Sequence, residues 1–134
     1  MARALILETT FLVDLEREVR SGGRGPAQET LERHGDDRLY LTFTIAGELA
    51  CGASLSDRER WETFVSPFHV LPATREVCWE YGKAYRYLRG AGQLIGANDL
   101  WIAATALAND MPVVTRNEGH FRRVPGLAVV EYRS

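Results

Sequence analysis

Residues 4–10 read ALILETT, four apolar residues followed by an acid and two threonines. A short apolar run that ends in polar residues predicts a buried strand over Ala4–Leu7. The next apolar residues recur at helical spacing: Phe11, Leu12, Leu15 and Val19. They predict a helix from about Thr10 to Val19. A strand that leads directly into an amphipathic helix is the first half of a βαβ unit, so this stretch favours a parallel α/β sheet.

The rest of the chain continues the alternation of strand and helix. Further strands are predicted over Leu39–Phe43, Phe68–Leu71, Pro112–Thr115 and Leu127–Val130. Further helices are predicted over Pro26–His34, Thr44–Ser54, Arg58–Val65, Ala73–Arg89 and Asn98–Ala108, with one helical turn at Glu118–Phe121. This order predicts an α/β fold of three layers, with a mostly parallel central sheet of four to five strands and helices on both faces.

Length and composition are those of an ordinary globular domain. The chain has 134 residues, of which 46% are hydrophobic and 25% charged, so we expect one domain spanning residues 1–134. No apolar run approaches the roughly 18–20 residues that span a bilayer, and the N-terminus lacks the features of a signal peptide. We therefore expect a cytoplasmic protein without membrane contact. Cys51 and Cys78 belong to no C-x-x-C pattern and are expected to be buried thiols.

Polar side chains stand where predicted strands end or helices begin. Glu8 follows the first strand, and Glu48 lies one turn into the helix after the second. Asp99 begins the alanine-rich helix, and Asn117 follows the fourth strand. Because the carboxyl ends of parallel strands lie along one edge of a sheet, we expect these four residues to gather there. Three carboxylates and an amide supply the hard oxygen ligands that Mg²⁺ or Mn²⁺ prefers.

Each of these residues also has a purely structural interpretation. Glu8 and Asp99 suit the start of a helix, where the dipole favours a negative charge. Glu48 would need a partner on the inward side of its helix, which an arginine would supply as well as a cation. Asn117 is a common turn residue. Four threonines at strand ends would orient the acids or a metal-bound water, or simply cap helices: Thr9, Thr10, Thr44 and Thr115.

The net charge of −2 argues mildly against a nucleic-acid binder. If several acids are concentrated in one pocket, however, the remaining surface is more basic than the total suggests. Three histidines occur in unrelated contexts without H-x-x-x-H spacing: His34, His69 and His120. Neither a zinc site nor a catalytic histidine is therefore expected.

Five motifs in a fixed order suggest a family. They are the strand ending in acid-Thr-Thr, TFTIAGEL (42–49), GQLIGANDLWIAATALA (92–108), PVVTRNEGHF (112–121) and VPGLAVV (124–130). This series resembles the PIN-domain ribonucleases, and in size and C-terminal segment the VapC-type toxins of bacterial toxin–antitoxin pairs. The resemblance covers the chain from Leu5 to Tyr132, and it implies a PIN-like fold.

The resemblance also implies an activity, that of an endoribonuclease dependent on Mg²⁺ or Mn²⁺. Its acidic site would be Glu8, Glu48 and Asp99, with Asn117 beside the fourth strand. Glu8 and Asp99 would be the primary metal ligands, and Glu48 would bind the ion or activate its water. The family usually has Asp where Glu8 stands, which shifts the carboxylate by about one bond, or ~1.5 Å. It commonly has Asn or Ser where Thr10 stands.

The same resemblance implies RNA as the substrate, a small VapB-like antitoxin as the partner, and a homodimer. Arg116, Lys83 and Arg86 are candidate contacts to RNA phosphates, with solvated surface charges as the alternative. Aromatic residues in Ala73–Arg89 and Trp61–Phe68 would serve a dimer or antitoxin interface, or the core.

Two other functions stay open from the sequence. Glu8 and Asn117 also fit a catalytically weak relative that binds RNA or a partner protein through the same crevice. A small phosphohydrolase with Glu8 as its nucleophile is the third possibility.

Overall fold

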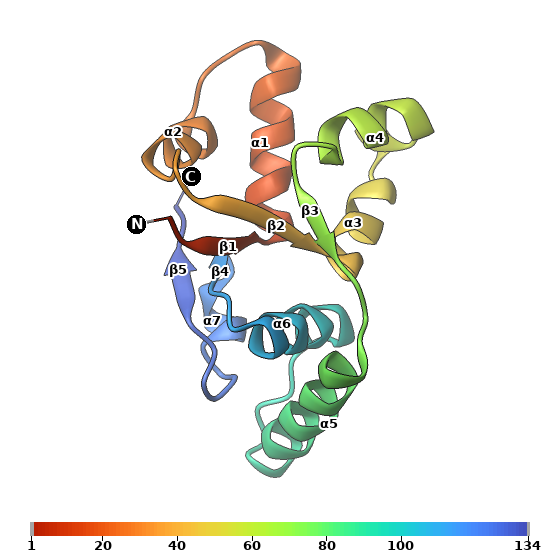
Figure 1. The fold of residues 1–134 in the computed structure, drawn as a ribbon, viewed down its shortest axis with the longest axis vertical. Coiled ribbons are helices and arrows are strands. Elements are labelled where there is room, and N and C mark those ends of the chain that lie inside the picture. The colour runs from red at the N-terminus through yellow and green to blue at the C-terminus, as the bar shows by residue number, and fades with distance from the viewer. Residues whose placement is uncertain (1, 134) are drawn as a thin grey trace.

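The computed structural model describes residues 2–133 and has a five-stranded sheet at its centre (Figure 1). The strands are β1 (Ala4–Leu7), β2 (Arg38–Thr42), β3 (His69–Leu71), β4 (Val113–Thr115) and β5 (Val129–Glu131). Their order across the sheet is β3-β2-β1-β4-β5, and all four pairings are parallel. The predicted α/β fold with a parallel central sheet is therefore confirmed.

Helices cover both sides of this sheet. They are α1 (Thr9–Ser21), α2 (Pro26–Arg33), α3 (Phe43–Ala50), the short 3₁₀ helix η1 (Ala53–Leu55), α4 (Arg58–Val65), α5 (Arg75–Gly90), α6 (Ala97–Asn109) and α7 (Glu118–Phe121). Figure 1 shows α1, α2 and α4 on one side and α5, α6 and α7 on the other, with α6 between the sheet and α5. No helix of residues 2–133 is long and apolar enough to cross a membrane.

Helix starts differ from the prediction by a few residues, and capping explains two of the differences. Helix α3 begins before Thr44 because the Thr42 hydroxyl accepts a hydrogen bond from the Ile45 amide at 3.2 Å. Helix α5 begins at Arg75 because Thr74 caps it in the same way. The helix predicted to begin at Asn98 begins one residue earlier, with Gly96 as the N-cap of α6, so Asn98 lies inside the first turn. The Asn98 side chain is therefore free to contact Glu48.

The core lies between the sheet and the helices packed on it. Leu5 and Ile6 of β1 are fully buried, as expected for a central strand covered on both faces. In α6, Ala103, Ala104 and Ala106 are also fully buried, because small side chains let this helix approach its neighbours closely. Helix α6 packs mainly against α5 and also against α3, which carries Glu48.

The prediction of buried cysteines is wrong, since Cys51 and Cys78 are both exposed. Cys51 directly follows α3 as its C-cap residue. Cys78 lies on α5, whose buried residues are Val77, Ala84 and Leu88. Its neighbour Val77 faces the core, so Cys78 points to solvent.

Candidate functional site

Glu8 is a buried carboxylate at the junction of β1 and α1, only 3% exposed. Its Oε1 accepts hydrogen bonds from the hydroxyls of Thr10 at 2.7 Å and Thr115 at 2.6 Å. Burial raises the pKa of the Glu8 carboxyl above its ordinary 4.5; the threonine hydrogen bonds lower it in part, and the negative charge of Asp99 raises it further. No basic side chain of residues 2–133 forms an ion pair with Glu8. A cation beside it would therefore favour the ionised form.

The two threonine hydroxyls that donate to Glu8 are themselves held by backbone amides. The Arg116 amide donates to the Thr10 hydroxyl at 3.1 Å, and the Asn117 amide donates to the Thr115 hydroxyl at 2.8 Å. A hydroxyl has one proton to donate, and an amide on its oxygen leaves that proton free for Glu8. The backbone amides of Arg116 and Asn117 therefore orient the two threonine hydroxyls, which in turn orient the Glu8 carboxylate.

Glu48 lies at the same edge, on α3, and is half-buried. Its Oε1 accepts a hydrogen bond from the Thr9 hydroxyl at 2.6 Å, and its Oε2 accepts one from the Asn98 amide group at 3.2 Å. No arginine or lysine of the described residues forms an ion pair with it. Glu48 is thus held by two neutral donors, the side chains of Thr9 and Asn98, which are the sequence neighbours of Glu8 and Asp99.

Asp99 lies in the first turn of α6, and its contact is one that the sequence did not suggest. The Asp99 Oδ2 atom lies 2.9 Å from Nδ1 of His120, on α7. The same Nδ1 lies 3.1 Å from the side-chain amide of Asn117. Asn117 therefore contacts a histidine that in turn contacts the acid. The sequence predicts no functional histidine, because none of the three has a metal-binding spacing. The signal that could have identified His120 is its position three residues after Asn117.

The structure brings the acids to one edge but does not form a compact three-carboxylate cluster. Among residues 2–133, no group of three or more His, Cys, Asp or Glu side chains is arranged to hold a metal ion. The charge of Asp99 contributes to raising the pKa of Glu8, while Glu48 turns toward Thr9 and Asn98. Glu8 and Glu48 contact hydroxyl and amide donors, and Asp99 contacts the imidazole of His120. The donor set itself, carboxylate oxygens held by hydroxyls and amides, fits a hard divalent cation.

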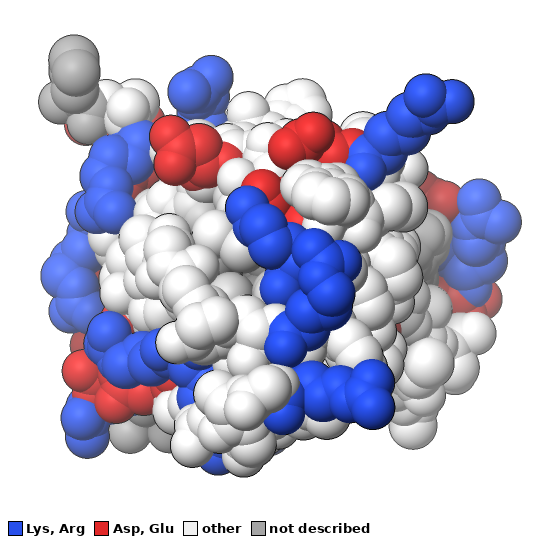
Figure 2. All heavy atoms as spheres, turned by 90° about the horizontal axis from the view of Figure 1, so that it is seen from below, with Lys and Arg blue, Asp and Glu red and all other residues white. Residues whose placement is uncertain are grey.

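The candidate RNA contacts lie in two different places. Lys83 and Arg86 belong to α5, where Lys83 pairs with Glu80 at 3.2 Å and Arg86 lies over the Trp79 ring at 5.4 Å. Figure 2 shows the lower end of the molecule in Figure 1, the end at which α5 lies, with basic side chains predominating near its centre. Arg116 follows β4 instead, and its guanidinium contacts a buried acid of α1, Asp14.

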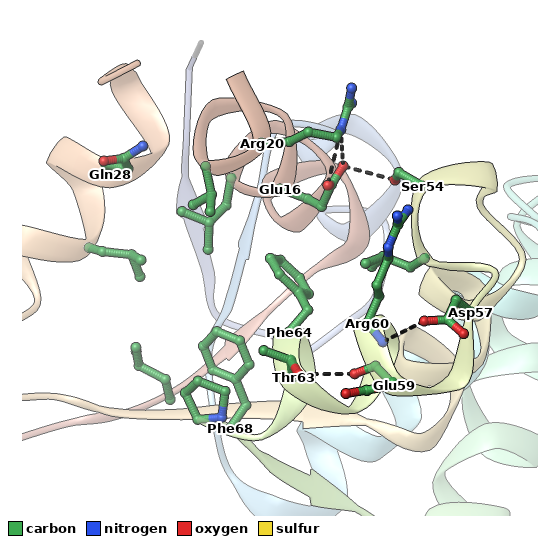
Figure 3. A pocket seen from close by; sticks show the side chains of 16 residues that line it. Glu16, Arg20, Gln28, Ser54, Asp57, Glu59, Arg60, Thr63, Phe64 and Phe68 are labelled. Carbon is green, nitrogen blue, oxygen red and sulfur yellow. Dashed lines mark hydrogen bonds and ion pairs between the residues drawn. The ribbon is translucent and has the colours of Figure 1, made fainter. Parts of the chain in front are cut away.

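A groove of about 1050 Å³ opens between α1, α2 and α4 on the other side of the sheet (Figure 3). Apolar side chains make up much of its lining: Leu15, Val19, Leu31, Leu39, Phe64 and Phe68. Charged groups of both signs stand around them, among them Glu16 with Arg20 and, on α4, Glu59 with Arg60 (Figure 3). Phe64 and Phe68 come from the aromatic segment predicted to serve an interface or the core.

Comparison with known proteins identifies the family. Residues 5–127 match the model of the PIN domain. This chain belongs to the PIN domain family. It is 34% identical over 97 residues to Ribonuclease VapC1 of Haemophilus influenzae, spanning 69% of this chain and 72% of that protein. It is 31% identical over 134 residues to Ribonuclease VapC of Rickettsia bellii, spanning 94% of each chain. Within the PIN domains, the chain therefore groups with VapC.

Solved structures of this PIN group have the same fold. VapBC2 of Rickettsia felis, bound to a DNA fragment from its promoter, aligns with a TM-score of 0.81 at 24% identity, over 97% of this chain and 99% of that one. VapBC-1 of nontypeable Haemophilus influenzae aligns with a TM-score of 0.74 at 27% identity, over 96% and 97% of the two chains. Membership of the PIN ribonucleases implies the use of a divalent metal ion.

Proposed function

We propose that this PIN domain, taken as one unit of 134 residues, is a metal-dependent endoribonuclease and the toxin of a type II toxin–antitoxin module. The observation that carries the proposal is the burial of the Glu8 carboxylate at the carboxyl end of β1, where it has no ion-pair partner among residues 2–133. Open α/β sheets bind ligands at this edge. The relatives named as ribonucleases supply the reaction class.

In this proposal, Glu8 and Asp99 are the metal ligands and Mg²⁺ is the ion, with Mn²⁺ able to replace it. The ion would polarise the scissile phosphate and acidify a bound water. Thr10 and Thr115 hold the Glu8 carboxylate in place through Oε1. Glu48 accepts the proton of the attacking water, because Thr9 and Asn98 fix its two oxygens without neutralising its charge.

Asn117 takes part through His120 rather than as a direct ligand. Its side chain lies against the imidazole that contacts Asp99. Contacts of this kind orient a ligand and tune its affinity for the ion. His120 and Asn117 are therefore proposed to hold the Asp99 carboxylate in its binding orientation.

RNA would lie across the surface near the acids. Lys83 and Arg86 are exposed on α5, which suits phosphate binding. The exposed Trp79 beside Arg86 offers a surface on which a base can stack. Arg116 would reach RNA only through the part of its guanidinium that Asp14 leaves free.

The proposed partner is a VapB-like antitoxin, because the structural relatives include VapBC complexes. The groove between α1, α2 and α4 suits one apolar face of an amphipathic helix, with rim charges of both signs for its polar face. We also propose a homodimer, for which the exposed tyrosines of α5, Tyr85 and Tyr87, are a candidate surface.

The competing function is a catalytically weak PIN domain that binds RNA or a partner without cutting it. The lack of a compact three-acid cluster in residues 2–133 favours this alternative. Cleavage of total RNA with Mn²⁺ and with EDTA separates the two. We expect Mn²⁺-dependent products that Glu8→Ala and Asp99→Ala abolish, while Glu118→Ala, which removes a surface acid of α7, still cleaves. RNA binding without metal-dependent products would support the weak relative, and activity retained in EDTA would support a phosphohydrolase that uses Glu8 as nucleophile.

A further inference from the structure

Asp14 is a buried carboxylate that the proposed reaction does not use. It lies on α1 with its side chain 5% exposed. Both of its oxygens contact Nη1 of Arg116, at 3.1 and 2.9 Å. A second arginine, Arg17, is more distant at 3.5 Å and is mostly exposed. The main partner of this buried charge is therefore Arg116, which lies far away in the sequence, directly after β4.

The same arginine is connected to the acidic site through its backbone. The Arg116 amide donates to the Thr10 hydroxyl, and that hydroxyl donates to Glu8. The next amide, of Asn117, donates to the Thr115 hydroxyl, which also donates to Glu8. Any movement of the segment after β4 would therefore move both hydroxyls that hold the carboxylate.

We propose that Asp14 and Arg116 are a positioning pair, which fastens the segment Thr115–Asn117 to α1 and so aims two hydroxyls at Glu8. The inference rests on the proposed function in one respect, that Glu8 binds a divalent ion. Sites of this kind need their ligands placed within about 0.5 Å, which a surface loop alone does not provide. The buried Asp14 supplies a fixed point, because an unpaired charge there would be costly and the arginine is held to it.

This pairing also explains why Arg116 is poorly suited to be mainly an RNA contact. Its Nη1 is occupied by both oxygens of Asp14, and its positive charge is matched by that acid. An arginine that bound phosphate would instead keep its guanidinium free for two parallel hydrogen bonds. The two roles predict different consequences when the side chain is changed.

The test compares Arg116→Gln, Arg116→Lys and Asp14→Asn with the parent protein. Mn²⁺ affinity is measured by calorimetry, kcat and KM by cleavage of a single-stranded RNA, and amide exchange at residues 116 and 117 by NMR without metal. The control is Val65→Ala, a core variant on α4, used to match the loss in thermal stability. We expect Arg116→Gln and Asp14→Asn to weaken Mn²⁺ binding by about 10–100-fold, the usual effect of losing a residue that orients a ligand.

The remaining expectations separate positioning from other roles. Three results would each support the positioning pair: a lower kcat with a nearly unchanged KM, faster exchange of both amides, and partial recovery of Mn²⁺ affinity in Arg116→Lys. Mn²⁺ affinity and amide exchange equal to those of Val65→Ala would overturn it and leave a purely stabilising ion pair. A raised KM with unchanged metal affinity would overturn it in favour of an RNA contact. If the parent binds no Mn²⁺ but the two amides exchange faster in the variants, the pair stands and the metal-dependent function fails.

Discussion

Glu8→Gln should make the protein more stable without metal and remove the stabilisation that metal provides. Glu8 is buried, contacts no basic side chain of residues 2–133, and lies near the charge of Asp99. Glutamine keeps the length of the side chain and the oxygen that accepts from Thr10 and Thr115. The substitution therefore removes the buried negative charge but preserves both hydrogen bonds.

The sign of the pH dependence follows from the raised pKa of Glu8. Below its ordinary pKa of 4.5, the carboxyl is protonated in both the folded and the unfolded chain. As the pH rises from 4.5 through the higher folded pKa, the unfolded chain releases its proton first. The free energy of unfolding measured in EDTA should therefore fall over this window in the parent, and this fall should be absent in Glu8→Gln.

The stability gained by Glu8→Gln and the stability gained by binding Mn²⁺ can both be given an order of magnitude. Removing an uncompensated buried charge at neutral pH should raise the free energy of unfolding by on the order of 1–3 kcal/mol. A divalent ion at one hundred times its Kd adds about 2.7 kcal/mol to a protein that binds it only when folded. For a chain of this length, one kcal/mol corresponds to roughly 4 °C in Tm. The parent should therefore gain about 10 °C with saturating Mn²⁺.

Thermal unfolding of the parent and Glu8→Gln, each in EDTA and in Mn²⁺ between pH 4 and 8, measures all of these quantities. Glu118→Gln is the matched control, because it neutralises an acid that is paired with Arg122 on the surface. The control should keep the gain from Mn²⁺. An equal gain in Glu8→Gln would show that the ion does not bind at Glu8. A lower stability of Glu8→Gln in EDTA would refute the inference that the buried charge of Glu8 destabilises the metal-free protein.

Three further predictions concern other parts of the molecule. His120→Ala should reduce Mn²⁺-dependent cleavage by about tenfold, and His120→Asn should restore part of it, because asparagine can replace the Nδ1 contact to Asp99; equal rates for the two variants would contradict this. Arg86→Ala should weaken RNA binding to an inactive Asp99→Asn background and reduce the salt dependence by about one phosphate contact, as measured by fluorescence anisotropy. Phe64→Glu should prevent complex formation with the product of an adjacent antitoxin reading frame in size-exclusion chromatography, while the rate of RNA cleavage stays unchanged.

The fold was predictable because its signals are local. An apolar run such as Leu5–Leu7 and the small residues of α6 each indicate a buried element without knowledge of the rest of the chain. The candidate acids were also recognisable, since Glu8 and Asp99 occupy the boundaries of such elements. Parallel topology then requires these boundaries to lie along one edge, whatever the details of side-chain packing.

The contacts that orient the acids were not predictable in the same way. His120 with Asp99, Asn98 with Glu48, and Arg116 with Asp14 all join residues that are distant in the sequence. Nothing near Asp14 marks it as buried, because it occupies a helix rich in charged residues. Its burial depends on where the segment after β4 lies, and only the folded chain determines that.

Two threonines restrain the carboxylate of Glu8, whose side chain is one methylene longer than that of an aspartate. The additional methylene would let the carboxylate move, but Oε1 is held at 2.6 and 2.7 Å by hydroxyls from two different elements. The backbone amides of Arg116 and Asn117 donate to these two hydroxyl oxygens, so each hydroxyl keeps its own proton for Glu8. The carboxylate is therefore restrained by side chains that the segment after β4 holds in turn.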